Sequence, residues 1–278
     1  MTELFELSAP ASADTHLVDS GVARHLFMPN GSRLYDVDDA TWRQLEDLQR
    51  SGNDSGLTEL LGRLGVQAPA YVDDAPPVEP PIRALSLAVA QKCNLGCSYC
   101  YAEGGSFGGP AADMGLQTAL ASVDLLFSQV AAGERVNLAF LGGEPMLNRA
   151  VLRAATERAS ALAAERGVEA TFSMTTNGTR LTEDDGDFFE AYGFAVTVSL
   201  DGLGPVHDRL RPFLGGQGSY DRILSRVGPL LARQRRMQIS ARVTVTPTNL
   251  GLAEALDAFV ALGFHSVGFS PLLRSPTG

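Results

Sequence analysis

The stretch LSLAVAQKCNLGCSYCY occupies residues 85–101 and joins an apolar run to three closely spaced cysteines. Cys93, Cys97 and Cys100 are the only cysteines of the 278-residue chain, and their spacing is C-x3-C-x2-C. Thiolates at this spacing on one loop can converge on a soft metal centre. Clusters of four irons are usually held by four cysteine thiolates. Three thiolates would leave one iron open to a small molecule, so we predict an iron–sulfur cluster with a vacant position here.

Two alternatives to a cluster are weaker. A structural zinc ion takes four protein ligands, so a histidine would have to complete the set. None of the histidines lies near the loop in sequence; they are His16, His25, His207 and His265. A disulfide framework is disfavoured because three is an odd number and nothing in the sequence indicates an oxidising compartment.

The composition excludes several classes of protein. A net charge of −10 argues against nucleic acid as the main partner, because phosphate binding needs a basic face. The sequence contains no run of 18 apolar residues, so we expect no membrane partner. The N-terminus carries Glu3 and Glu6 where a signal peptide carries positive charge. We therefore expect a cytoplasmic protein.

Residues 1–72 are predicted to form a small α+β domain. A hairpin is expected over residues 25–37, with Asn30-Gly31 as its turn. Asp39 is expected to cap a helix whose apolar residues recur at helical spacing. A second helix is expected around Leu57 to Leu64.

A proline-rich, polar linker is predicted over residues 73–82, followed by a larger domain over 83–278. In that domain, apolar runs rich in β-branched residues alternate with helical stretches. The runs lie at 85–90, 136–141, 170–175, 195–200, 239–246 and 266–271, and helical stretches at 117–130, 148–166 and 252–262. This alternation predicts an α/β fold with a parallel sheet. Six such units favour a partial (β/α)6 TIM-type barrel over an open sheet. Because the chain ends at Gly278, we expect either a fragment of a longer protein or a variant without further clusters.

Polar motifs follow or end several predicted strands, where the chemistry of a barrel is found. Glu144, after two glycines that allow close approach of a ligand, could accept hydrogen bonds from an ammonium group, although a plain turn is the alternative. Asp201 is a candidate catalytic base or substrate anchor, and its alternative is a turn-forming role. An inward-facing Arg242 would suit a carboxylate. The candidate residues are Gly142, Gly143, Glu144, Asn177, Ser199, Asp201 and Arg242.

Over residues 82–278 these motifs, in this order, resemble the radical S-adenosylmethionine (SAM) enzymes. The resemblance implies that the three cysteines bind a [4Fe-4S] cluster whose fourth iron is chelated by SAM. An electron donor such as flavodoxin or ferredoxin would drive cleavage of SAM to a 5′-deoxyadenosyl radical, which abstracts a substrate hydrogen. The implied SAM contacts are Gly142, Gly143 and Glu144 to the amino group, Ser199 and Arg242 to the carboxylate, Asn177 to the ribose or carboxylate, and Tyr99 to the adenine.

Further motifs are similar to the peptide- and protein-modifying branch that carries SPASM or twitch extensions. They are Ser199-Leu200-Asp201-Gly202, His207-Asp208-x2-Arg211-Pro212 and Gly216-x-Gly218-Ser219-Tyr220-Asp221. The layout most resembles the maturase of quinohemoprotein amine dehydrogenase, which implies thioether crosslinking of a peptide. The N-terminal domain resembles a winged-helix-like leader-peptide recognition element. Sulfatase-maturase-like oxidation of a side chain, a small-molecule substrate, and a binding module with a structural metal site remain alternatives.

Overall fold

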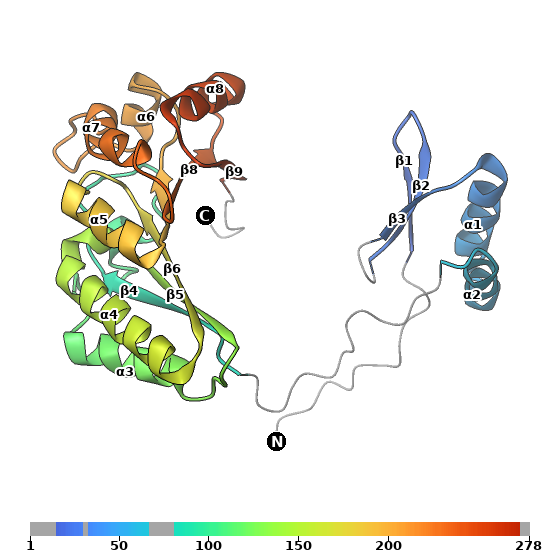
Figure 1. Cartoon of the computed structure of the whole chain (residues 1–278). Helices are drawn as coiled ribbons and strands as arrows, with labels where there is room; N and C mark the ends of the chain where they lie inside the picture. The colour runs from blue at the N-terminus through green and yellow to red at the C-terminus, as the bar shows by residue number, and fades with distance from the viewer. Residues whose placement is uncertain (1–14, 30–32, 67–80, 273–278) are drawn as a thin grey trace. The chain divides into compact units, whose positions relative to one another are not determined.

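The computed structural model describes residues 15–29, 33–66 and 81–272. The chain divides into two compact units, Met1–Pro80 and Pro81–Gly278, and each is described by itself (Figure 1). Within the described ranges, no helix is both long enough and apolar enough to cross a membrane.

The N-terminal unit is an antiparallel three-stranded sheet with two helices. Its elements are β1 (His16–Asp19), β2 (Arg24–Met28), β3 (Arg33–Asp36), α1 (Asp39–Ser51) and α2 (Asp54–Arg63). Strand β2 lies in the centre and pairs with both neighbours. A small apolar core joins sheet and helices, and it contains Leu26, Met28, Leu45, Leu57, Leu60 and Leu61.

Several expectations for this unit can be compared with the structure. The pairing of β2 with β3 confirms the hairpin, whereas its Asn30-Gly31 turn lies outside the described residues. Strand β1 was not expected. The cap of α1 is Asp38 rather than Asp39, because Asp38 has an extended backbone and its carboxylate accepts a hydrogen bond from the Thr41 backbone N–H at 2.7 Å. Residues 73–80 of the predicted linker also lie outside the described ranges.

The C-terminal unit is built on a six-stranded parallel sheet whose strands follow one another in chain order. The strands are β4 (Ala84–Ala90), β5 (Arg135–Gly142), β6 (Glu169–Thr176), β7 (Ala195–Ser199), β8 (Gln238–Val245) and β9 (Val267–Pro271). The helices are η1 (Glu103–Gly105), α3 (Leu116–Phe127), η2 (Pro145–Asn148), α4 (Arg149–Arg166), α5 (Glu183–Tyr192), α6 (Pro205–Leu210), α7 (Tyr220–Leu231) and α8 (Leu252–Leu262). An open doubly wound sheet would reverse its strand order, and this sheet does not. The structure therefore confirms the partial (β/α)6 barrel.

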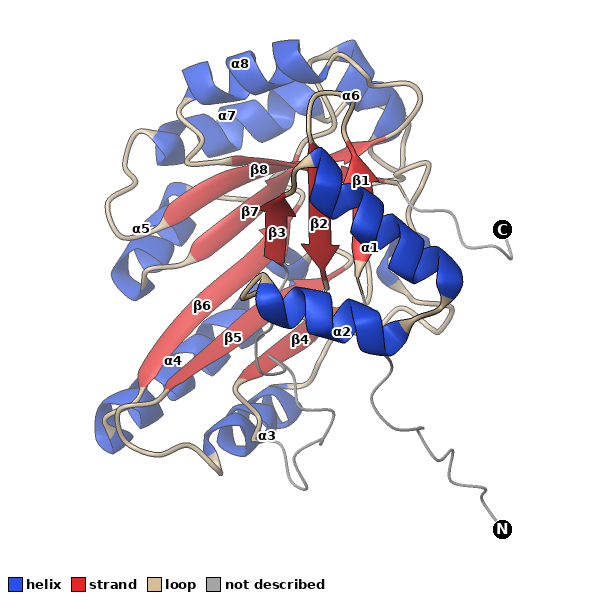
Figure 2. Cartoon of the chain, turned by 90° about the vertical axis from the view of Figure 1, so that its right-hand side faces the viewer, coloured by secondary structure: helices blue, strands red, loops and turns tan. Residues whose placement is uncertain are grey.

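The two faces of this sheet differ in character. On β5, Val136, Leu138 and Phe140 are buried in a core shared with α3, α4, α5, α7 and α8. The intervening Asn137 and Ala139 are half-exposed and point to the opposite face. Figure 1 shows α3, α4 and α5 on one side of the strands, and Figure 2, which views the sheet from its other side, shows them behind it. The helix-free face is thus the concave face of the partial barrel.

A buried carboxylate joins α4 to α5. Asp185 accepts hydrogen bonds from Arg149 Nε at 2.7 Å, Arg153 Nη2 at 3.0 Å and the Thr182 hydroxyl at 2.8 Å. Its side chain is 1% exposed. Burial raises the pKa of Asp185, but the hydrogen bonds from Arg149, Thr182 and Arg153 outweigh burial, and the net pKa lies below its usual value. The charged form is therefore the one that stabilises the fold.

We predict that Asp185→Asn lowers the free energy of unfolding by about 3 kcal/mol, because two arginines lose a buried counter-ion. Because the folded-state pKa is lowered, this stabilisation is complete above the unfolded-state pKa and is lost as pH falls below 3.8. Denaturant unfolding of the full chain across pH measures both effects.

The matched control is Asp187→Asn on the same helix, whose side chain is 63% exposed and pairs with Arg233 at the surface. It should change the free energy of unfolding by less than about 1 kcal/mol. Equal losses in the two variants would contradict the role assigned to Asp185.

Candidate functional site

The cysteine loop, residues 91–102, leaves the carboxyl end of β4 and is held from outside by a second loop. This second loop, residues 211–219, joins α6 to α7 and is called the bracing loop below. Gly96 N donates to Pro212 O at 2.8 Å, and Leu214 N donates to Asn94 O at 3.2 Å. Ser98 N donates to the last residue of α6 at 3.0 Å. The cysteine loop therefore has a defined path although it contains little regular structure.

The three thiols are half-buried and not joined by disulfides. Burial raises the pKa of Cys93 and Cys97; for Cys97, Arg211 opposes this shift while Cys93 and Cys100 add to it. These mutual electrostatic effects require the thiols to lie near one another. In the described ranges, no three His, Cys, Asp or Glu side chains converge on a position for a single metal ion. Binding of a four-iron cluster by these thiols therefore stays a prediction.

His207, one of the possible zinc ligands, has both ring nitrogens engaged inside the protein. Its Nδ1 accepts a hydrogen bond from the Asp201 backbone N–H at 3.1 Å, so the ring proton is on Nε2. That proton is donated to the Ser219 hydroxyl at 3.0 Å, and Ser219 donates to the Arg211 carbonyl at 2.6 Å. Burial lowers the pKa of His207 to about 3. His207 is therefore a neutral structural residue of α6, and it contacts the bracing loop through Ser219.

Gly142 and Gly143 bring the end of β5 into contact with the cysteine loop. Gly143 N donates to Ala90 O at 2.8 Å, and the next backbone N–H donates to Lys92 O at 2.9 Å. A Cβ on Gly143 would overlap the Lys92 carbonyl and the Gly105 Cα. Gly142 has φ of +141°, and a Cβ there would overlap Ala90 O. Only glycine allows this approach to the start of the cysteine loop and to η1, which follows the loop.

The Glu144 side chain continues this contact toward β6. Its carboxylate is fully buried and accepts from Met146 N at 3.0 Å, the Thr176 hydroxyl at 2.7 Å and Asn177 N at 2.7 Å. Burial raises the pKa of Glu144, and the three donors partly offset that shift. The Glu144 carboxylate therefore joins the ends of β5 and β6. Its contact with the SAM amino group stays a prediction.

Asn177 lies 3% exposed beside the first cysteine. Its Nδ2 donates to Asn94 Oδ1 at 2.9 Å and points to Cys93 Sγ at 3.7 Å. Its Oδ1 accepts from the Thr179 hydroxyl at 2.7 Å, and Asn94 donates to the same hydroxyl at 2.9 Å. Asn177 therefore positions the loop, and its contact with the ribose or carboxylate of SAM stays a prediction.

Asp201 is fully buried below the cysteine loop. One carboxylate oxygen accepts from Thr244 N at 2.8 Å, and the other accepts from the Tyr99 hydroxyl. The Tyr99 hydroxyl in turn accepts from Arg211 Nη1 at 2.7 Å. Both bonds reach outside the turn at Gly202, so the carboxylate joins β8 to the cysteine loop and positions Tyr99 and Arg211. Its roles as catalytic base, substrate anchor or turn-forming residue stay predictions. Burial raises the pKa of Tyr99, so its hydroxyl is protonated, and its contact with the adenine stays a prediction.

Arg211 is the residue that the sequence reasoning left outside the site. Its side chain is 11% exposed and lies 3.6 Å from the Asp201 carboxylate. It interacts electrostatically with Cys97 and Cys93. Its Nε is buried without a hydrogen-bond partner among the described residues. A buried cation with a spare donor near two of the three thiols fits a site for a negatively charged group. The signal in the sequence that could have identified Arg211 as a site residue is the motif His207-Asp208-x2-Arg211-Pro212.

Ser199 and Arg242 lie opposite one another on β7 and β8. Both belong to the concave face, because their neighbours Val198 and Val243 are buried on the helix side. Arg242 is exposed and has no ion pair among the described residues. A carboxylate could therefore bind here without displacing a protein partner.

Comparisons with known proteins agree with this geometry. A sequence profile of the Radical SAM superfamily matches residues 87–233. An uncharacterised protein of Methanocaldococcus jannaschii is 27% identical over 192 residues, covering 69% of this chain and 63% of that protein. The serine-type anaerobic sulfatase-maturating enzyme of Klebsiella aerogenes is 27% identical over 209 residues, covering 74% and 50% respectively. The solved structure of anSMEcpe with bound AdoMet and Cp18Cys peptide has a TM-score of 0.59 at 22% identity, over 70% of this chain and 52% of that one, which is a likeness of fold.

The chain spans between half and about two-thirds of the length of these two relatives.

We predict that Gly143→Ala destabilises the cysteine loop, because the added methyl overlaps backbone atoms that cannot move aside. The cost in unfolding free energy should be about 1–3 kcal/mol, with reduced iron retention after reconstitution. Thermal unfolding and iron analysis measure the two effects.

Gly228→Ala provides the control, because a Cβ there meets nothing within 4 Å. It lies inside α7 and should leave iron retention unchanged and stability equal or higher. A Gly143→Ala protein that matched Gly228→Ala in both measurements would contradict the packing described above.

Proposed function

Because the chain belongs to the radical SAM superfamily, we propose that Cys93, Cys97 and Cys100 hold its [4Fe-4S] cluster and that the enzyme modifies a peptide or protein. Enzymes of this superfamily use such a cluster together with SAM. The observation that carries the proposal is the cysteine loop, which holds three half-buried thiols, two of which, Cys93 and Cys97, interact with the buried Arg211. The strand-end glycines hold the loop on one side and the bracing loop holds it on the other.

The chain's own residues would prepare this site for the cofactors. The cluster would supply the electron that cleaves SAM and yields a radical able to abstract hydrogen. Arg211 would offset the negative charge of the thiolates, since an opposite charge favours the ionised form of a neighbour. The Leu95 backbone N–H, at 3.4 Å, and the Asn177 amide would donate to the Cys93 sulfur.

SAM would lie across the concave face at the carboxyl ends of the strands. Ser199 and Arg242 would bind its carboxylate, because Arg242 is exposed and unpaired within the described ranges. The strand end at Gly142 and Gly143 would approach the amino group, together with Glu144. Asn177 and Tyr99 complete the proposed set of contacts. In this placement SAM would contact the half-exposed side chains of the concave face, and the packing of the helices on the other face would not change.

A peptide or protein substrate is favoured over a small molecule by two observations. The first is similarity to the sulfatase-maturating enzyme of Klebsiella aerogenes, a protein named for action on another protein. The second is the N-terminal unit, whose β3 pairs on one side with β2 and has no strand on its other side among the described residues. Leu34 on β3 is 60% exposed. An extended leader peptide could add a strand there, with main-chain hydrogen bonds giving affinity.

Two products are consistent with this proposal. Thioether crosslinking joins a cysteine sulfur to a carbon of another residue, and the resemblance to the amine-dehydrogenase maturase favours it. Oxidation of one side chain is the second candidate, and similarity to a sulfatase-maturating enzyme favours it. Mass spectrometry distinguishes them, because a crosslink consumes a cysteine and blocks backbone fragmentation between the joined residues. Oxidation to a carbonyl instead leaves a group that reacts with a hydrazide.

We predict that anaerobic reconstitution gives about four irons per chain and that dithionite then releases 5′-deoxyadenosine from SAM. Cys97→Ala should lose both iron and cleavage, whereas Ser98→Ala, an exposed neighbour in the same loop, should keep both. Arg242→Ala should keep the iron and bind SAM at least about tenfold more weakly, because a charged hydrogen-bond donor is lost. A full cluster that never yields 5′-deoxyadenosine would refute the proposal.

We also predict that the reconstituted full chain binds a substrate leader peptide through β3. Fluorescence anisotropy with labelled peptides encoded next to the gene measures the affinity. Leu34→Asp should abolish binding, whereas Val22→Asp, at a site 96% exposed outside β3, should not. Failure of every such peptide to bind would favour a small-molecule substrate.

A further inference from the structure

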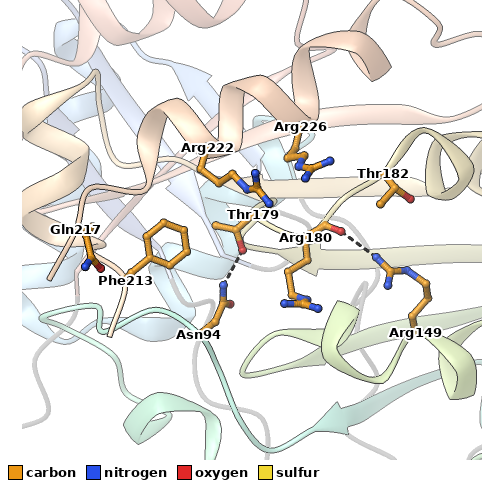
Figure 3. Close-up of a pocket in the computed structure, with 9 residues that line it drawn as sticks. All are labelled: Asn94, Arg149, Thr179, Arg180, Thr182, Phe213, Gln217, Arg222 and Arg226. Carbon is orange, nitrogen blue, oxygen red and sulfur yellow. Dashed lines mark hydrogen bonds between the residues drawn. The ribbon is translucent and has the colours of Figure 1, made fainter. Parts of the chain in front are cut away.

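A positively charged pocket lies next to the cysteine loop, whose Asn94 forms part of its wall (Figure 3). Its volume is about 640 Å³. Arg180 follows the end of β6, while Arg222 and Arg226 lie one turn apart on α7, and all three line it together with Asn94 and Phe213. None of these residues belongs to the site proposed for SAM.

The charge of this pocket is not neutralised by ion pairs with the residues that the structure describes. Of its four arginines, Arg149 is paired with the buried Asp185. Arg180, Arg222 and Arg226 have no ion pair among the described residues, and Arg180 and Arg222 are exposed. The chain as a whole carries a net charge of −10. Three free guanidinium groups in one pocket of an acidic protein therefore indicate an acidic partner.

The pocket lies next to the proposed cluster. Asn94, in its wall, directly follows Cys93 and accepts from Asn177, which also points to the Cys93 sulfur. Leu214 of the bracing loop, 72% exposed, donates its backbone N–H to the Asn94 carbonyl. Leu214 follows Phe213, which lines the pocket, and its exposed side chain offers an apolar contact near that charge, as protein interfaces do. Because Arg149 lies on α4 and Arg222 and Arg226 lie on α7, a partner here would approach the cysteine loop from the helix-covered side of the sheet.

We infer that this arginine pocket docks a small acidic electron-carrier protein, such as a flavodoxin. The inference rests on the proposed function, in which each cleavage of SAM consumes one electron. The carrier is oxidised by one electron, and the cofactor site is reduced by one. Substrate and SAM would occupy the concave face, so the electron has to enter from the helix-covered side. Charge complementarity at that side would steer the carrier to the cysteine loop.

The test compares the reconstituted enzyme with the double variant Arg222→Glu/Arg226→Glu. Calorimetric titration with flavodoxin should show saturable binding to the wild type that weakens with salt. The double variant should bind at least about tenfold more weakly. Its 5′-deoxyadenosine release should fall with reduced flavodoxin as donor and stay unchanged with dithionite, which needs no docking site.

Arg235→Glu is the matched control, because Arg235 is exposed, lies without an ion pair in the described part of the chain, and precedes β8 at the opposite end of the sheet. It should bind flavodoxin as the wild type does. Equal affinity of wild type and double variant, equal weakening in Arg235→Glu, or no binding to the wild type would each overturn the inference. Saturable binding of inorganic phosphate with unchanged flavodoxin affinity would also overturn it and identify a small-anion site. Absence of dithionite-driven cleavage in the wild type would instead count against the proposed function.

Discussion

The buried Glu144 carboxylate is the interaction on which the rest of the site depends. Together with the backbone N–H groups of Gly143 and Glu144, it ties the ends of β4, β5 and β6 into one unit. Leaving its donors unsatisfied would cost about 1–3 kcal/mol for each group. Because the same backbone contacts Lys92, the position of the first cysteine follows from the order of the sheet. The cysteine loop has little regular structure, and its position is fixed by these hydrogen bonds to the strand ends.

A second constraint comes from charges buried beneath the loop. Removing Asp201 and Arg211 from water is costly, and replacing such a pair with apolar residues is often neutral or stabilising. Their retention here is understandable if the interior cation serves the thiols above it. Arg211 lies near Cys97 and Cys93, and the Tyr99 hydroxyl and Asp201 fix its orientation. The network of Arg211, Tyr99 and Asp201 provides a positive potential where the thiolates must form. The packing of the surrounding core offsets the free energy that burial of these charges costs.

The sequence predicted the parallel sheet and the cysteine loop because these depend on local signals. Apolar runs rich in β-branched residues, helical stretches between them and the C-x3-C-x2-C motif are each readable within about 20 residues. It missed β1, a strand of four mostly exposed residues without an apolar pattern. It also left Arg211 out of the site, because its partners Tyr99 and Asp201 are 112 and 10 positions away and only the fold joins them. The burial of the Glu144 and Asp201 carboxylates could not be predicted, because no sequence motif shows whether a side chain points into the protein.

The one-sided core of the sheet has a consequence for how amino-acid changes in this enzyme should be interpreted. Helix-side residues such as Val198 hold the layers together, whereas concave-side residues such as Ser199 contribute little packing. Substitutions at consecutive positions of one strand should therefore affect different properties, stability on the helix side and activity on the concave side. In a deep mutational scan, changes on the helix side should reduce cellular abundance, while changes on the concave side should alter turnover at constant abundance. Alternation between these two phenotypes along β7 and β8 would map the lining of the reaction chamber.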